Sequence, residues 1–420
     1  MLDLFPDTAL VADGVLAIGG CATTGLAEEF GTPLVVYCER TLRARARAYL
    51  AAAPPDALVA YGTKAFPNLA ILRVLREEGI GADVSTLGEL AFAQAAEVPP
   101  ERLLFHGNNK SDEELRAAAA AGATVVLDAA DEPARAAAVG VERILVRLTP
   151  GVTADTHAAI ATAHEESKFG LAPEAALAAI RDARDRGIDV AGVHMHVGSQ
   201  LGRVDESLVA VERLAAFCAR CREELDWTPR VVDFGGGLGI PYAPEEEFLS
   251  IEEYVGGLLD AWQQASPEPV RVAFEPGRSL VGQAGTTLYR VGAVKRSGGV
   301  SYAAVDGGMS DNPRPQLYGA RFTALLANRA AEEPAGAYRI AGKHCESGDV
   351  LIDSVELPEP RRDDVLAVPA TGAYTLAIGS NYNGLPRPAV VLVADGEARI
   401  VRRRETIDDL LRLEAGWESA

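Results

Sequence analysis

The chain has 420 residues, enough for two or three domains, and its formal net charge of −20 at pH 7 leaves no basic surface for binding nucleic acid. The N-terminus lacks a basic, apolar leader and the apolar runs stay below the ~18 residues of a membrane span, so we expect neither a signal peptide nor a membrane segment. Five cysteines, an odd and small number, favour a cytoplasmic protein over a disulfide framework.

The first thirty residues contain two short strand candidates. Leu10–Val11 and Val15–Ile18 flank Asp13-Gly14, a pair typical of a turn. We expect residues 1–30 to contribute strands to a β domain formed later in the chain. A helix is predicted next, over Thr41–Ala53.

Between residues 57 and 277 the chain alternates strand-like and helix-like segments. The strand candidates are short and too continuously apolar for strands with one face in water. They are Leu58–Tyr61, Ala82–Ser85, Leu103–His106, Thr124–Asp128, Ile144–Leu148, Val190–His196, Arg230–Phe234 and Val270–Phe274. The helix candidates are Asn68–Glu78, Leu87–Glu97, Asp112–Ala121, Pro173–Arg186, Glu206–Leu225 and Ile251–Ala265. Ser111 and Glu114 predict a capping box at the start of one helix.

Eight parallel strands alternating with helices predict an α/β protein with a (β/α)₈ TIM barrel over residues 31–280. Right-handed crossovers place the carboxyl ends of all the strands on one face. Polar and glycine residues gather there, and we interpret this face as the active one. They are Lys64, Asp83, Ser85, His106, Asp128, Arg147, His196, Gly235–Gly237, Glu275 and Arg278.

After residue 280 helical periodicity fades and β-rich segments separated by Gly and Pro follow. This pattern predicts a second, mainly antiparallel β domain over residues 281–420. The strand candidates there are Thr287–Val294, Tyr302–Val305, Ala389–Val393 and Arg399–Arg403.

Lys64 directly follows the first apolar strand, in Tyr61-Gly-Thr-Lys64. A lysine at the end of a barrel strand is expected to be partly desolvated, which frees its amine to form an imine. Most lysines are surface charges, but this position favours a cofactor held as a Schiff base.

The glycine-rich segment Gly235-Gly236-Gly237 follows the seventh strand. It does not match a dinucleotide fingerprint, and by itself it could be a tight turn. Barrels commonly bind phosphate with backbone N–H groups in the loops after strands seven and eight. The segment therefore predicts a phosphate site.

Glu275-Pro-Gly277-Arg278 follows the eighth strand. A carboxylate that faces a pyridine nitrogen keeps the ring protonated and makes it a strong electron acceptor. Arg278 could bind a carboxylate or phosphate through two hydrogen bonds. The alternative is a surface ion pair between Glu275 and Arg278.

No metal site is expected. We place His194 and His196 on opposite faces of the strand that they end, which would keep them from binding one ion together. A packed core role suits His194 better than His196, whereas His196 can lie over an aromatic ring and Ser199 can reach a phosphate oxygen. Cys218 and Cys221, a lone C-x-x-C inside a helix, are predicted to be core residues.

The predicted β domain carries polar clusters of its own, which could also be simple turns. They are Asp311–Tyr318, Cys345–Asp349 and Gly372–Tyr374. Cys345 lies among polar residues rather than in an apolar run, a setting that suits a reactive thiol.

Taken together, these motifs resemble those of the diaminopimelate decarboxylases, fold type III enzymes related to alanine racemase and ornithine decarboxylase that use pyridoxal 5′-phosphate. The resemblance covers residues 30 to 390, and the motifs stand in the family's order. They are Tyr61–Ala65, Ser85–Glu89, His106–Lys110, Ser167–Gly170, His194–Gln200, Gly235–Gly237, Glu275–Arg278, Arg314–Tyr318, Cys345–Asp349 and Gly372–Tyr374.

The resemblance implies a role for each site residue. Lys64 would bind the cofactor's aldehyde, His196 would stack on the ring and Glu275 would pair with the ring nitrogen. Cys345 and Glu346 would come from a second subunit, so that a homodimer shares its active sites. The other cofactor contacts would be Asp83, Ser199, Gly235, Gly236, Gly237, Gly277, Arg278 and Tyr374, and the substrate contacts would be Arg278, Arg314, Tyr318, Glu346 and Tyr374.

The implied reaction is decarboxylation of meso-2,6-diaminopimelate to L-lysine, with Lys64 or a thiol returning a proton to the carbon. The alternative within the fold is a decarboxylase for another basic amino acid, of the ornithine, arginine or carboxynorspermidine type. A racemase would place an arginine rather than Glu275 against the ring nitrogen. A regulator without enzymatic activity would not need both Lys64 and Cys345.

Overall fold

The computed structural model describes residues 1–149, 167–266 and 268–415. The chain forms two compact units, which we describe separately. The barrel unit consists of Arg43–Ile240 and Glu247–Leu280, and the β unit consists of Met1–Leu42, Pro241–Glu246 and Val281–Ala420.

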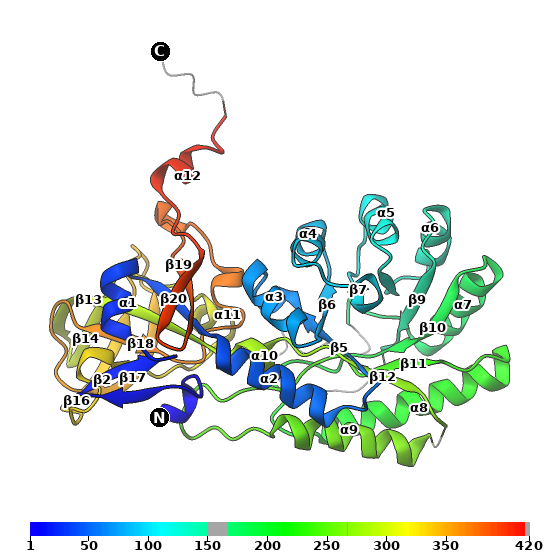
Figure 1. The fold of residues 1–420 in the computed structure, drawn as a ribbon, viewed down its shortest axis with the longest axis horizontal. Helices are drawn as coiled ribbons and strands as arrows, with labels where there is room; N and C mark the ends of the chain where they lie inside the picture. Colours follow the sequence, from blue (N-terminus) through cyan, green and yellow to red (C-terminus); the bar gives the residue numbers. More distant parts are fainter. Residues whose placement is uncertain (150–166, 267, 416–420) are drawn as a thin grey trace. The chain divides into compact units, whose positions relative to one another are not determined.

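The barrel unit contains a closed barrel of eight parallel strands, which confirms the predicted TIM barrel (Figure 1). Neighbouring strands follow the order β10-β11-β12-β5-β6-β7-β8-β9, and every pairing is parallel. All carboxyl ends therefore open on one face. The strands are β5 (Leu58–Gly62), β6 (Gly81–Val84), β7 (Leu103–Phe105), β8 (Thr124–Leu127), β9 (Arg143–Arg147), β10 (Asp189–His194), β11 (Val231–Asp233) and β12 (Arg271–Phe274).

Helices follow the barrel strands, and local capping sets where several of them begin. Asn68 accepts hydrogen bonds from the next turn's backbone, Ser111 forms the predicted capping box, and Ser250 forms another. The helix at Glu132–Ala138 was not predicted, because seven alanine-rich residues show too little periodicity. The helices are α2 (Glu39–Ala52), α3 (Leu69–Glu77), α4 (Leu87–Ala95), α5 (Asp112–Ala120), α6 (Glu132–Ala138), α7 (Pro173–Asp185), α8 (Asp205–Leu225), α9 (Ile251–Ala265) and α10 (Arg278–Val281).

The barrel interior is packed with apolar side chains, several of them alanines. One buried cluster draws on six strands and is at most 7% exposed; it comprises Leu58, Ala60, Leu104, Val126, Leu145, Ala191 and Ala273. These residues form an apolar layer below the carboxyl ends, and a second cavity of about 330 Å³ is lined by five of them and by residues at the amino ends of the strands, Thr124, Arg143 and Arg271. The polar residues at those ends are therefore the ones that line the mouth.

The β unit is built on a nine-stranded sheet in which most pairings are antiparallel, as predicted. Only two of its pairings, β14 with β16 and β4 with β19, are parallel. The strands are β4 (Leu34–Cys38), β13 (Gly285–Ser297), β14 (Val300–Val305), β15 (Leu325–Leu326), β16 (Gly336–Ala341), β17 (Val350–Leu357), β18 (Val365–Val368), β19 (Ala389–Ala394) and β20 (Glu397–Arg402).

The N-terminal strands β1 (Leu10–Ala12), β2 (Val15–Ile18) and β3 (Cys21–Ala22) form a separate three-stranded sheet in the β unit. They share an apolar core with the large sheet without pairing to its strands. The strand β4 lies inside the range expected for the barrel, yet it pairs with β13 and β19 of the β unit. It is buried along its whole length, and a short, continuously apolar run does not reveal which sheet it will join.

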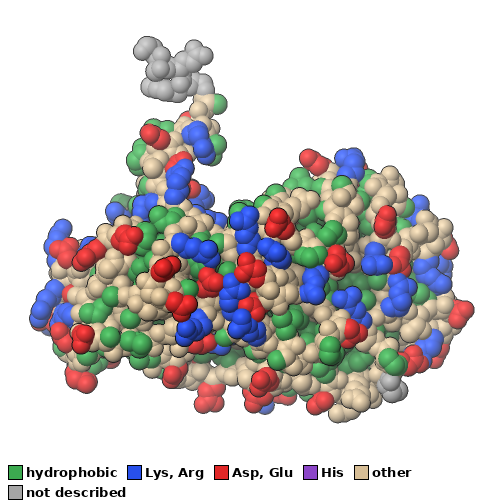
Figure 2. Space-filling view, viewed as in Figure 1, with side chains coloured by type: hydrophobic (Ala, Val, Ile, Leu, Met, Phe, Trp, Pro, Cys, Tyr) green, Lys and Arg blue, Asp and Glu red, His purple; other side chains and the backbone are tan. Residues whose placement is uncertain are grey.

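The remaining described helices are short: η1 (Leu2–Leu4), α1 (Thr23–Phe30), η2 (Thr63–Ala65), η3 (Pro100–Arg102), α11 (Arg314–Tyr318), η4 (Ala327–Arg329), η5 (Leu376–Ile378), η6 (Tyr382–Gly384) and α12 (Ile407–Leu411). No helix in the described residues combines the length and the apolar character needed to cross a membrane. Acidic and basic side chains are interspersed on the face seen in Figure 2.

Candidate active site

A cavity of about 390 Å³ lies at the carboxyl ends of the barrel strands. It brings together residues from six of the eight strand ends. The first and the last of them in the sequence, Lys64 and Glu275, are separated by more than 200 positions. Those predicted to lie on the active face are Lys64, Asp83, Ser85, His106, Arg147, His196 and Glu275. The predicted lysine and acid thus share one cavity.

Lys64 enters this cavity from η2, the single turn that follows β5. Buried neighbours hold the turn: Thr63 donates a hydrogen bond to the Asp83 carbonyl at 2.7 Å, and the Tyr61 hydroxyl contacts Phe66 backbone atoms at 3.1 Å. Lys64 itself is exposed, whereas partial desolvation was expected. Lys64 is therefore an exposed residue of the cavity lining, on a turn whose neighbours are held by hydrogen bonds.

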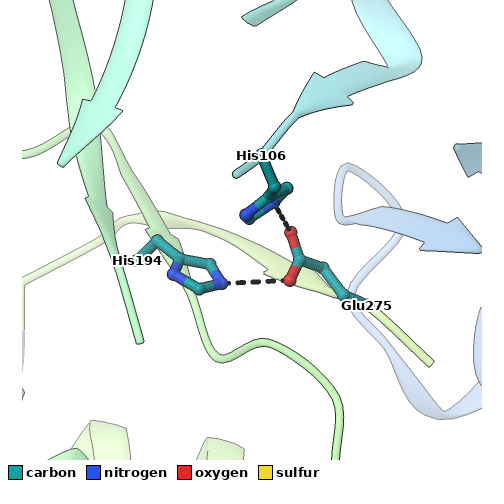
Figure 3. Close-up of side chains that lie close together, drawn as sticks. All are labelled: His106, His194 and Glu275. Carbon is teal, nitrogen blue, oxygen red and sulfur yellow. Dashed lines mark hydrogen bonds and ion pairs between the residues drawn. The ribbon is translucent and has the colours of Figure 1, made fainter. Parts of the chain in front are cut away.

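Glu275 lies just beyond β12 and is bonded by two histidines (Figure 3). Its Oε1 is 2.6 Å from Nε2 of His106, and its Oε2 is 3.0 Å from Nε2 of His194. The three residues are 8%, 7% and 1% exposed. The predicted alternative for Glu275, an ion pair with Arg278 at the surface, is therefore wrong: its partners are buried histidines.

The electrostatics of this group favour an ionised Glu275. Burial alone would raise its pKa, but the charge of His106 and the hydrogen bonds from His106 and His194 hold the pKa well below its usual range. Burial would lower the pKa of His106, and the charges of Glu275 and Asp83 raise it above its ordinary value. Burial lowers the pKa of His194 to about 4, against the charge of Glu275. His194 is therefore neutral while Glu275 is charged.

Two further buried acids lie beside Glu275. Burial raises the pKa of Asp83 to about 6, with the charge of Glu275 adding to this effect and that of His106 opposing it. Burial, followed by the charge of Glu275, raises the pKa of Asp233 well above its usual range. Asp233 also accepts a hydrogen bond from the Gly235 N–H at 2.8 Å. Of the three neighbouring acids, Glu275 is thus the one whose pKa is lowered, so its surroundings favour the carboxylate form.

The triple-glycine loop packs directly against this cluster. An added Cβ on Gly236 would come within 2.3 Å of the Glu275 carbonyl oxygen, and one on Gly235 within 2.5 Å of the Met195 carbonyl oxygen. Gly235 and Gly237 also have φ values of +68° and +126°. Close packing thus explains the glycines structurally, and phosphate binding by their N–H groups stays a prediction.

His196 faces the same loop. Its Nδ1 accepts a hydrogen bond from the Gly236 N–H at 3.2 Å, which leaves the ring proton on Nε2. Burial, and then the positive charge of Lys64, lower the pKa of His196 well below its ordinary value. The ring is therefore neutral and is fixed in the cavity wall.

The expectation that His194 and His196 point to opposite faces is wrong, because residues two apart in a strand share a face, and both side chains line the cavity. His106, His194 and Glu275 bring three possible metal ligands within 4.8 Å of one another. Each histidine instead directs Nε2 at the carboxylate, and the absence of a metal stays a prediction.

Arg278 and Ser199 contact each other. The Arg278 guanidinium, at the start of α10, donates a hydrogen bond to the Ser199 hydroxyl at 3.1 Å. Gly277, predicted to contact phosphate, has its Cα 3.6 Å from where a Cβ on Gly62 would stand. The β12 loop therefore packs against the end of β5.

Arg147 is a cavity residue to which the sequence assigned no role. Asp128 binds its guanidinium at 3.3 Å, and the Phe169 ring lies 4.6 Å from it. Position at the end of a strand was the available signal for Arg147, as it was for His106. Nothing in the local sequence distinguished His194 as a partner of Glu275.

The predicted substrate residues Arg314 and Tyr318 belong to α11 of the β unit. Arg314 is 5% exposed, and its guanidinium lies 5.0 Å from the centre of the Tyr242 ring and 5.6 Å from that of Tyr318. Stacking on two aromatic rings fixes this cation. Tyr374, also in the β unit, has a φ of +56°.

Cys345 is exposed, whereas the other four cysteines of the chain are buried. Its N–H donates to Asn383 Oδ1 at 3.1 Å, and the same oxygen lies 3.2 Å from Nδ1 of His344. Glu346 lies beside it, with one carboxylate oxygen 3.5 Å from the Tyr382 hydroxyl. A single segment of the β unit therefore presents a thiol and a carboxylate side by side.

Comparison with known proteins places these residues in context. Residues 39–282 match the model of a family described as "Pyridoxal-dependent decarboxylase, pyridoxal binding domain". The chain is 43% identical over 423 residues to the diaminopimelate decarboxylase of Actinosynnema pretiosum subsp. auranticum, with 98% of this chain and 95% of that protein covered.

Solved structures agree with this similarity. The crystal structure of the diaminopimelate decarboxylase of M. jannaschii has a TM-score of 0.92 and 32% identity, and covers 98% of both chains. A lysine/ornithine decarboxylase of Vibrio vulnificus complexed with putrescine has a TM-score of 0.78 and 25% identity, and covers 89% of this chain and 97% of its own.

Proposed function

The chain belongs to the diaminopimelate decarboxylase family of pyridoxal-dependent decarboxylases, and we propose that it converts meso-2,6-diaminopimelate to L-lysine and CO₂. It is an enzyme that uses pyridoxal 5′-phosphate. The observation that carries the proposal is 43% identity over 98% of the chain to a diaminopimelate decarboxylase.

The residues of the barrel cavity fit this cofactor. An exposed lysine, an ionised acid and a neutral imidazole line the cavity, and the glycine loop packs against the imidazole and the acid. When bound, the cofactor supplies a ring that accepts the electron pair left behind when CO₂ departs.

Within this cavity, Lys64 would bind the cofactor's aldehyde, His196 would lie against the ring and Glu275 would face the ring nitrogen. Ser199, Gly277 and the loop Gly235–Gly237 would hold the phosphate, with Asp83, Arg278 and Tyr374 as further contacts. The loop supports this because its backbone already reaches the wall formed by His196 and Glu275. A carboxylate kept ionised beside the ring nitrogen would hold that nitrogen protonated.

The remote end of the substrate requires a different set of residues. Arg278, Arg314 and Tyr318 would bind its carboxylate, while Glu346 would bind its amino group and Tyr374 would contact it. A guanidinium that already packs against two rings loses little freedom when it binds a carboxylate. Binding energy gained at this end would orient the reacting carbon.

We further propose a homodimer in which Cys345 and Glu346 complete the active site of the other subunit, with Lys64 or Cys345 returning the proton. The exposed thiol supports this role, because a proton donor must reach the substrate. We expect the enzyme to act in the cytoplasm.

The test is CO₂ release by the purified chain with added cofactor, comparing meso-diaminopimelate with L-ornithine and L-lysine. We expect turnover of meso-diaminopimelate alone. Lys64→Ala should abolish both turnover and the visible absorbance of the bound cofactor, while Lys295→Ala, which changes an exposed lysine of the β unit, should leave both intact. Preference for ornithine would refute the substrate, and a wild type without the absorbance band would refute the cofactor site.

A further inference from the structure

Both carboxylate oxygens of Glu275 are engaged by histidines from other parts of the barrel. Oε1 meets His106, which follows β7, and Oε2 meets His194, the last residue of β10. Figure 3 shows the two rings approaching the carboxylate from different directions. A carboxylate held at both oxygens cannot rotate about its last bond without breaking one of these contacts.

His194 can serve Glu275 only as a hydrogen-bond donor. A carboxylate has no proton to give, so Nε2 of His194 carries the proton of this bond. Its Nδ1 is buried and has no hydrogen-bond partner in the described structure. Burying a nitrogen without a hydrogen-bond partner costs free energy. The hydrogen bond to Glu275 is the favourable interaction that the ring makes in this position.

His106 is held on several sides. Its Nε2 lies 2.6 Å from Glu275 and 3.7 Å from Asp83, and its ring meets that of His194 edge to face at 4.9 Å. Asp83 comes from β6, so His106 lies between an acid of β6 and the acid that follows β12. This arrangement fixes the direction in which the His106 N–H points.

A purely structural role would not require this chemistry. Buried charged groups commonly contribute no more to stability than well-packed apolar side chains of similar volume. Here two histidine rings and the acids Asp83 and Asp233 instead lie around the one carboxylate to which the proposed function gives a task.

We propose that His106 and His194 are positioning residues that clamp the carboxylate of Glu275, keeping it ionised and aimed at the cofactor's ring nitrogen. This inference rests on the proposed function, which places that ring in the cavity. Each Glu275 oxygen still has a second lone pair, so the clamp leaves the carboxylate able to accept one more hydrogen bond. Asp83 and Asp233, the neighbouring acids, would otherwise compete for the ionised state by charge repulsion.

A matched pair of substitutions isolates the clamp. Both contacts pass through Nε2, whose place the amide nitrogen of glutamine can take, while asparagine is one carbon too short. We therefore compare His106→Gln with His106→Asn, and His194→Gln with His194→Asn. Each enzyme is loaded with cofactor labelled with ¹⁵N at the ring nitrogen.

The ¹⁵N chemical shift of the bound cofactor reports whether the ring nitrogen is protonated, independently of turnover. We expect both asparagine variants to shift it toward the neutral ring and to lower kcat roughly 10- to 100-fold, as for other outer partners of a reactive group, with little change in KM. The glutamine variants should retain the protonated ring and most of the activity. Thermal unfolding of each variant checks that it folds.

The clamp is refuted if the asparagine variants keep both the protonated ring and the wild-type kcat. If the asparagine variants do not fold, the glutamine variants test the clamp. Their side-chain amide still donates to Glu275, so loss of ring protonation in these variants would also refute the clamp. A wild type that binds the cofactor without releasing CO₂ from meso-diaminopimelate would instead overturn the proposed function. The ¹⁵N comparison would still test the clamp in that protein.

Discussion

Glu275 illustrates how a residue's surroundings decide its chemistry. A buried glutamate would ordinarily be protonated, and the partners that reverse this preference come from β7 and β10, 169 and 81 positions away in the sequence. Asp233, buried nearby without such partners, shows the opposite outcome: its pKa is raised well above the usual range, first by its burial and then by the charge of Glu275.

Glu275→Gln tests the charge of this residue directly. Glutamine keeps the size of the side chain but cannot hold a ring nitrogen protonated, so we expect kcat to fall roughly 10²- to 10³-fold, the range for losing one key electrostatic contact. Cofactor binding, read from the visible absorbance, should persist. Unchanged turnover would contradict the role of Glu275.

Asp83 carries a pH dependence of stability. Its pKa in the folded state is raised to about 6, so the fold holds this proton more tightly than the unfolded chain does. The resulting stabilisation is fully present below about pH 4 and is lost as the pH rises through about 6.

We therefore expect the unfolding free energy of wild type, relative to Asp83→Asn, to fall by about 2 kcal/mol between pH 4 and pH 7. Asparagine stays neutral, so the variant serves as the reference at each pH. Urea unfolding of the two proteins side by side measures the difference. If the unfolding free energies of the two proteins change with pH in parallel, the fold does not raise the pKa of Asp83.

At the scale of elements, close backbone contacts between strand ends shape the cavity. Gly192 lies at a register irregularity between β9 and β10, and a Cβ there would come within 1.8 Å of the Val231 carbonyl oxygen on β11. The approach of β10 to β11 brings His194 opposite Asp233 in the strand register. Glycine in these strands is thus a condition for the cluster around Glu275.

Gly236→Ala tests such a contact in the loop. The added methyl group would meet the Glu275 backbone, so the β11 loop and the β12 loop must separate. We expect a lower melting temperature and weaker cofactor binding. Gly256→Ala is the control, since this glycine lies inside α9 with nothing within 4 Å of its Cβ position.

In the control, alanine should raise the unfolding free energy by about 0.5–1 kcal/mol through its better helix propensity. The two substitutions add the same methyl group, so opposite signs would isolate the effect of the contact. If Gly236→Ala and Gly256→Ala change the stability equally, the glycine loop tolerates a side chain.

At the scale of the whole molecule, the central question is whether two chains share each active site. In the proposed dimer the barrel of one subunit depends on Cys345 of the other, although Lys64 and Cys345 are both present in every chain. A symmetric dimer contains two identical sites of this kind.

Mixing Lys64→Ala chains with Cys345→Ala chains tests the shared site. Random assortment makes half of the dimers mixed, and each mixed dimer has one intact site of two, so we expect about a quarter of wild-type activity. Chains carrying both substitutions are the control and should stay inactive when mixed with either parent. Absence of recovery in mixtures that form mixed dimers would argue against sharing.

Much of the barrel could be predicted from residue types. Each predicted strand lies within two residues of an observed one, because eight continuously apolar segments were separated by helical periodicity and capping signals. The strand β4 shows the limit: a buried run of five residues contains no information about its partners. Its place between β13 and β19 depends on segments about 250 and 355 residues away.

The candidate site was likewise predictable in part from local sequence, and in part only from tertiary contacts. Lys64, His196 and Glu275 were predicted because each carries its reactive group at a strand end, which is a local property of the sequence. The pairing of His194 with Glu275, and the neutral state of one histidine beside a charged carboxylate, could not be predicted. Protonation depends on burial and on the distances to other charges, and only the closed barrel brings those groups together.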